Sequence, residues 1–135
     1  ALKTSEDVEF NMLSFVRAKK IQFINDRLYN YRIKRKDSLT DIYKGKSQAN
    51  NHKILFKNVL ENWHKLGFLK NNEHKVLKYF TRISYNVINS ITDASFKKAY
   101  ASELLSIFWQ HMSEDIKYKL DPNTMDKLSF IQKIA

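Results

Sequence analysis

The chain has 135 residues, enough for one ordinary domain or for one small domain with part of another. Hydrophobic residues make up 43% and aromatic residues 13% of it, which supports a buried core and argues against disorder throughout. Because there are only two glycines and one proline, turn-rich sheet folds are disfavoured and long helices are expected. The absence of cysteine excludes a disulfide scaffold and suits a reducing cytoplasm.

The net charge of +10 is concentrated near the amino end of the chain. Residues 17–36 hold eight Lys and Arg against one acid, Asp26, which gives a local charge of +7. A local field of this size favours a polyanionic partner: a diphosphate, a nucleic acid or an anionic membrane surface. Composition alone leaves all three open.

A helix is the first element that the chain predicts. Thr4 or Ser5 can cap it, and Glu6 and Asp7 lie in its first turn, where the helix dipole favours negative charge. Its apolar side is expected to hold the residues that recur at helical spacing: Val8, Met12, Phe15 and Val16.

Two short strands around a turn are predicted next. Residues 21–24 and 28–33 are rich in aromatic and branched side chains, and the polar residues 25–27 separate them. The pattern favours a small hairpin or strand pair between residues 20 and 33.

From about Asp41 the pattern predicts helices to the end of the chain. Three long apolar stripes follow one another, Gly67 ends the first helix, and residues 121–124 are a stop-and-restart signal before a short last helix. Long helices with short connections imply an antiparallel bundle. Its core is predicted to contain one or two residues from each stripe: Trp63, Phe80, Val87, Leu104 and Phe108.

The acidic pair Glu6-Asp7 stands in a longer pattern. It is followed by Lys20-Ile21-Gln22-Phe23-Ile24, then by Leu28-Tyr29-Asn30-Tyr31-Arg32, and then by Lys34 and Ser38. This order and spacing resemble the carboxyl-terminal end of the catalytic domain in family 2 glycosyltransferases of the GT-A fold. The resemblance implies that Asp7 is the catalytic base and that Glu6 shapes the acceptor site. Taken alone, an acidic pair of this kind is also what the first turn of many helices contains.

A basic, polar loop follows the second predicted strand. By the same resemblance, Arg32, Lys34, Arg35, Ser38 and Thr40 bind the donor diphosphate, where cations and hydroxyls stabilise the charge of the leaving group. The family often has His or Arg at the position of Lys34, so this chain keeps the charge there and loses the planar fork.

The resemblance covers roughly residues 4–40 and divides the chain. Residues 1–43 are expected to be the tail of a GT-A catalytic domain, and residues 44–135 a helical carboxyl-terminal domain. The nucleotide-binding part would precede Ala1, so the isolated chain is expected to be inactive. The expected enzyme transfers a sugar from a nucleotide-sugar donor to a glycan or lipid-linked acceptor in bacterial cell-surface polysaccharide synthesis. It would act in the cytoplasm or at the inner face of the membrane.

No cofactor site is predicted within these residues. The four histidines have no partner at metal-ligand spacing, and the chain has no Asp-x-Asp and no glycine-rich phosphate loop. The resemblance implies a divalent metal, Mg or Mn, in the full-length enzyme.

Two other classes of function remain open. One is a basic helical module that binds nucleic acid, which the pI of about 9.7 favours. Against specific nucleic-acid binding, the charge is concentrated in the strand-and-loop region, and the long helices alternate in sign. The other is a helical interaction domain that docks on a partner protein or on an anionic membrane surface.

Overall fold

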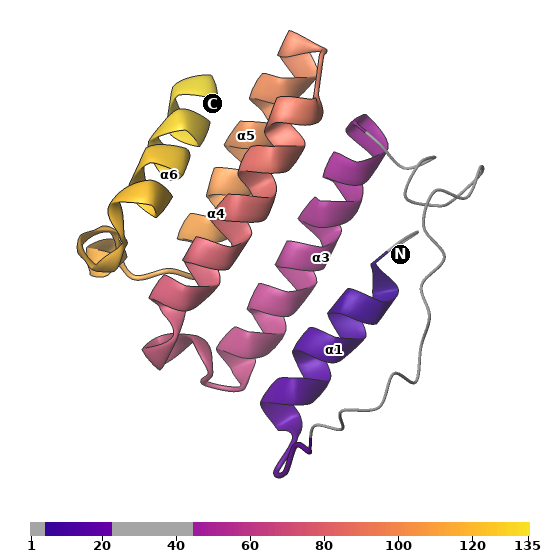
Figure 1. Ribbon diagram of the computed structural model, residues 1–135, viewed down its shortest axis with the longest axis vertical. Coiled ribbons are helices and arrows are strands. Elements are labelled where there is room, and N and C mark those ends of the chain that lie inside the picture. The colour runs from indigo at the N-terminus through magenta and orange to yellow at the C-terminus, as the bar shows by residue number, and fades with distance from the viewer. Residues whose placement is uncertain (1–4, 23–44) are drawn as a thin grey trace.

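The computed structural model describes residues 5–22 and 45–135, and these fold as helices (Figure 1). The mainly helical fold expected from the sequence is confirmed. The elements are α1 (Glu6–Arg17), α3 (Lys46–Lys65), the 3-10 turn η1 (Leu69–Asn71), α4 (Glu73–Ser90), α5 (Ala94–Trp109), the 3-10 turn η2 (Glu114–Lys119) and α6 (Pro122–Ile134).

The four helices α3 to α6 form an antiparallel bundle. Each runs opposite to the one before it, and α6 lies on the side of α4 and α5 that faces away from α1 (Figure 1). Short connections force this arrangement, because a helix that follows a tight turn can only return beside its predecessor. None of the helices in the described part of the chain is long and apolar enough to cross a membrane.

The predicted core is confirmed. Trp63 is 8% exposed, and Phe80, Val87, Leu104 and Phe108 are more deeply buried. Phe80 lies at the centre: its ring stacks on that of Phe56, with 4.1 Å between the centroids, and approaches the rings of Trp63 and Phe108. Aromatic side chains from three helices therefore hold the bundle together.

Gly67 ends α3, as its position in the sequence predicts. Its φ of +72° is a left-handed conformation that glycine adopts without a steric penalty. Two backbone hydrogen bonds close the end of the helix, from Phe68 N to Trp63 O (3.0 Å) and from Gly67 N to His64 O (2.9 Å). The Phe68 ring then packs edge-on against Trp63, with 5.0 Å between centroids. This turn redirects the chain towards α4.

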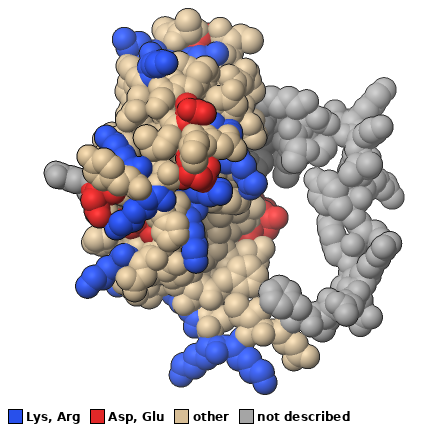
Figure 2. Space-filling model, turned by 60° about the vertical axis from the view of Figure 1, so that its left-hand side comes forward, with Lys and Arg blue, Asp and Glu red and all other residues tan. Residues whose placement is uncertain are grey.

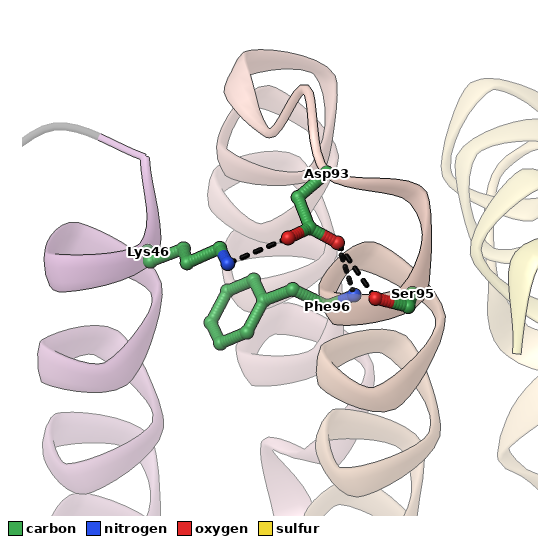
Figure 3. A network of polar contacts seen from close by, with 4 residues as sticks. All are labelled: Lys46, Asp93, Ser95 and Phe96. Atoms are coloured by element: carbon green, nitrogen blue, oxygen red, sulfur yellow. Dashed lines mark hydrogen bonds and ion pairs between the residues drawn. The ribbon is translucent and has the colours of Figure 1, made fainter.

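Aspartates cap α5 and α6. Asp93 Oδ1 accepts from Phe96 N (2.9 Å) at the start of α5, and Asp121 Oδ1 accepts from Thr124 N (3.1 Å) at the start of α6. The stop-and-restart signal at residues 121–124 is thus confirmed. Asp93 also accepts from Ser95 Oγ and pairs with Lys46 Nζ at 2.6 Å (Figure 3). The cap of α5 therefore ties that helix to the first residue of α3.

Helix α1 lies outside the antiparallel series, beside α3. It packs along α3 and runs in the same direction (Figure 1). A parallel neighbour needs a long connection, and the chain between Arg17 and Lys46 supplies one. The apolar side predicted for this helix is partly wrong. Val8, Met12 and Val16 pack against the core, but Phe15 is 56% exposed, and Leu13 takes the inward position.

The predicted strand pair is not seen. Lys20, Ile21 and Gln22 have no regular secondary structure, and the rest of the two segments, residues 23–24 and 28–33, lies outside the described residues. The predicted domain division at residue 43 lies outside them too.

Candidate functional site

Glu6 and Asp7 occupy the first turn of α1, as predicted, and both are exposed to solvent. Ser5 is at the N-cap position, but the predicted cap is not made, since its side chain forms no capping hydrogen bond. Its φ of +68° departs from the extended conformation that a capping side chain requires. Asp7 Oδ1 instead accepts from Val8 N at 2.8 Å. Thr4, the other candidate cap, lies outside the described residues.

Three polar contacts hold α1 on α3. The Trp63 indole donates to Met12 O (3.1 Å), Asn58 Nδ2 donates to Glu9 Oε1 (2.8 Å), and Arg17 donates to Asn62 Oδ1 (3.2 Å). They lie along the whole helix, so they fix its position lengthwise as well as its rotation. Of the three acids in the first turn, Glu9 is therefore the one bound to the bundle.

This geometry leaves Glu6 and Asp7 available for chemistry. Adjacent residues of a helix do not share a face, so the two carboxylates point in different directions. A carboxylate in contact with solvent can accept a proton from a bound hydroxyl. A base and a neighbouring carboxylate with a separate role therefore fit this helix end.

The predicted diphosphate loop is not placed by the structure. Arg32, Lys34, Arg35, Ser38 and Thr40 all lie outside the described residues. The structure therefore brings Glu6 and Asp7 to one helix end and leaves their relation to the loop as a prediction.

The structure brings two histidines together. His64, near the end of α3, and His111, just after α5, have ring centroids 5.8 Å apart. Burial and the neighbouring His64 lower the pKa of His111, while Glu61 acts in the opposite direction. The spacing of the two histidines in the sequence does not predict their proximity, because it arises only from packing. Across residues 5–22 and 45–135, no group of three or more His, Asp or Glu could hold a metal ion.

A second feature that sequence reasoning missed lies on α4. Lys75, Lys78 and Arg82 recur at i, i+3 and i+7 and share one face of the helix. Beside them is an apolar pocket of about 280 Å³, to which Met12 of α1 and Trp63 of α3 contribute. The spacing of the three cations could have been found in the sequence, but the pocket could not.

Charge elsewhere on the bundle is mixed. Figure 2 shows Lys and Arg interspersed with Asp and Glu over the displayed face. Ion pairs on the bundle include Lys53 with Glu103 and Lys119 with Asp115. A uniformly basic surface of the kind that binds nucleic acid is not what this face presents.

Compared with known proteins, the chain matches no family model, no curated protein and no solved structure.

Proposed function

We propose that this chain is the carboxyl-terminal part of a family 2 glycosyltransferase, which transfers a sugar from a nucleotide-sugar donor to a glycan or lipid-linked acceptor in cell-surface polysaccharide synthesis. The observation that carries the proposal is Asp7, an exposed carboxylate in the first turn of α1. The series of motifs that resembles the family begins in that helix. The contacts of the helix to α3 fix where the carboxylate lies.

In the proposed reaction, Asp7 accepts the proton of the acceptor hydroxyl. The hydroxyl oxygen forms a bond to the anomeric carbon of the donor sugar, and the bond from that carbon to the diphosphate breaks. The nucleoside diphosphate leaves with the electron pair. The charge that develops on it is stabilised by three cations and two hydroxyl donors: Arg32, Lys34, Arg35, Ser38 and Thr40.

Glu6 has a different role from Asp7 in this proposal. It lies on another side of α1 and shapes or orients the acceptor. The divalent metal that the resemblance implies is assigned to the nucleotide-binding part of the full-length enzyme. No step assigned to this chain uses the metal.

The proposal also includes the strand pair at residues 21–24 and 28–33 as the tail of a catalytic domain that ends near residue 43. The bundle is then a carboxyl-terminal appendage, and the enzyme acts in the cytoplasm or at the inner face of the membrane. Phe10 is 69% and Phe15 56% exposed on α1, and large apolar side chains so exposed suit a surface that packs against another part of the enzyme.

The test of the proposal is the turnover rate of the full-length protein with Asp7→Asn. This change keeps the shape of the side chain and removes the proton acceptor, so turnover should fall at least about a hundredfold while donor binding stays nearly unchanged. The matched control is Glu9→Gln, two residues along the same helix, whose carboxylate binds Asn58. Near-normal turnover in Asp7→Asn would remove the catalytic assignment.

A separate measurement tests the diphosphate loop. Arg32→Ala and Lys34→Ala in the full-length protein should each weaken binding of a nucleoside diphosphate by about tenfold, the usual effect of losing one charge-assisted contact. Lys133→Ala, at the last turn of α6, is the control for loss of one positive charge. Unchanged binding in both loop variants would assign the diphosphate to other residues.

A further inference from the structure

The pocket beside α4 is almost wholly apolar. Its volume is about 280 Å³, and Met12, Trp63, Phe68, Val76 and Tyr79 supply its carbon surface. Two of the polar groups at its edge already have partners within the protein. The Trp63 indole donates to Met12 O, and the Asn72 side chain donates to Phe68 O at 2.9 Å. What enters this pocket therefore gains from apolar burial and finds few free hydrogen-bonding groups.

A basic hollow adjoins the pocket. It is about 220 Å³ in volume, it shares Lys75 and Tyr79 with the apolar pocket, and it extends along α4 to Lys78 and Arg82. Because the two hollows adjoin at Lys75 and Tyr79, we treat them together as one groove, apolar at the end near Trp63 and cationic at the other. Lys75 lies where they join.

Two of the three cations are available to a ligand. Lys78 Nζ pairs with Asp121 at 3.0 Å, which neutralises it. Lys75 has no ion-pair partner within residues 5–22 and 45–135, and Arg82 lies over the Tyr79 ring, 5.5 Å from its centroid. All three side chains are exposed, so Lys75 and Arg82 can reach an anion in the hollow from one face of the helix.

We propose that this groove binds one molecule of an anionic amphiphile, a single alkyl chain that ends in a phosphate. The chain lies in the apolar pocket and the phosphate lies between Lys75 and Arg82. An apolar cavity of about 150 Å³ takes up a benzene-sized group, so this pocket accommodates a segment of chain about twice that size. A phosphate suits the cationic end because it accepts from the Arg fork and the ammonium group together.

The two ends of the groove select against other ligands. Free inorganic phosphate gains nothing from the apolar pocket, and a neutral amphiphile gains nothing from Lys75 and Arg82. A nucleic acid has a repeating charge with no apolar chain to place beside it. The site rests on these contacts and is independent of the glycosyltransferase proposal.

The experiment uses the 135-residue chain with dodecyl phosphate below its micelle concentration. Trp63 lines the pocket, so its fluorescence reports binding once the other tryptophan is removed by Trp109→Phe. We expect saturable binding at one site per chain. Inorganic phosphate and dodecyl maltoside, which has the same chain with a neutral head, should each bind at least about tenfold more weakly.

The charge variant Lys75→Ala/Arg82→Ala should weaken dodecyl phosphate binding at least about tenfold. Lys97→Ala/Lys98→Ala, on α5, removes the same charge outside the groove and should have no such effect. The affinity of each single variant, Lys75→Ala or Arg82→Ala, for dodecyl phosphate should lie between those of the double variant and the parent.

Three results would overturn the proposal. Equal affinity for the maltoside would show an unselective apolar pocket. Equal weakening by the two double variants would show that the protein's overall charge, and not this groove, attracts the ligand. Binding to vesicles of anionic lipid with no binding of the monomeric amphiphile would show a membrane-docking surface.

Discussion

Helices α1 and α4 are both amphipathic, yet they are buried to very different degrees. α4 contacts α3, α5 and α6 and has seven buried residues, whereas α1 packs mainly on α3 and has none. A helix with a single neighbour gains little apolar burial, and its propensity alone would not hold it in water. The bundle therefore supplies stability, and α1 depends on the bundle for its position.

A similar contrast separates two acids at helix starts, Asp93 on α5 and Asp7 on α1. Asp93 at the start of α5 caps the helix and binds Lys46, while Asp7 in the first turn of α1 bonds, within residues 5–22 and 45–135, only the Val8 amide. A carboxylate with several partners stabilises the fold, and one left exposed is free for a ligand. The predictions below test this division between the two regions.

The largest effect is expected in the centre of the bundle. Phe80→Ala should lower the free energy of unfolding by about 3–5 kcal/mol, because it leaves a cavity among the rings of Phe56, Trp63 and Phe108. Urea denaturation measures it. Tyr118→Ala, at a side chain that is 92% exposed, is the control and should change stability by less than about 0.5 kcal/mol. A loss below about 1 kcal/mol for Phe80→Ala would contradict the assigned core.

A smaller effect is expected where α1 meets the bundle. Trp63→Phe removes the indole N–H that donates to Met12 O, which should cost about 1–2 kcal/mol and speed amide exchange in α1 more than in α5. Trp109→Phe is the matched control, because Trp109 lies on α5 and contacts Lys117 in η2. If Trp63→Phe speeds amide exchange equally in α1 and α5, α1 is not held separately from the bundle.

The opposite sign is expected at Tyr100. Its hydroxyl is buried with no hydrogen-bond partner in the described structure, so Tyr100→Phe should stabilise the protein by about 1 kcal/mol. Burial also raises the pKa of Tyr100 in the folded state. The unfolded chain then ionises first, so stability is lost as the pH rises above about 10. Thermal unfolding between pH 8 and about 11 should show a smaller alkaline loss in the variant; equal losses would contradict the assigned burial.

The aspartates at helix starts should contribute differently to stability as the pH falls. The pKa of Asp93 is held well below its usual range, first by the Lys46 side chain and then by the Phe96 amide and the Ser95 hydroxyl. Lys78 and Thr124 lower the pKa of Asp121 to about 2. Their contributions are present above the unfolded pKa of about 4 and are lost as the pH falls through the folded values.

Asp93→Ala should therefore lower the melting temperature at pH 7, with a difference that shrinks below about pH 4. Asp7→Asn should change stability by less than about 1 kcal/mol, the usual contribution of a first-turn charge. Thermal unfolding from pH 7 to about 2 compares them. A larger loss of stability in Asp7→Asn than in Asp93→Ala would reverse the division of roles.

The bundle could be predicted from the sequence because its signals are long and redundant. The stripes through Phe80 and Leu104 repeat over several turns, and Gly67 and the Asp121-Pro122 pair mark helix ends by local chemistry. Three packing neighbours also make the apolar face of a helix wide, so one misassigned residue does not change the prediction.

The rest depended on contacts between distant segments. With one neighbour, the inward stripe of α1 is narrow, and the sequence does not decide between Phe15, which is exposed, and Leu13, which packs. Glu6 and Asp7 could be placed at a helix start by local rules. The proximity of His64 and His111 arises from the packing of α3 against the end of α5, and no local pattern records it.

Hydrogen exchange of the native chain, followed residue by residue, tests the division between α1 and the bundle most directly. The account predicts that amides in the middle of α4 and α5 exchange only through global unfolding, while those of α1 exchange through a separate opening of lower free energy. Amides of α1 that are as protected as those of α4 would contradict it, because α1 would then belong to the same cooperative unit as the bundle.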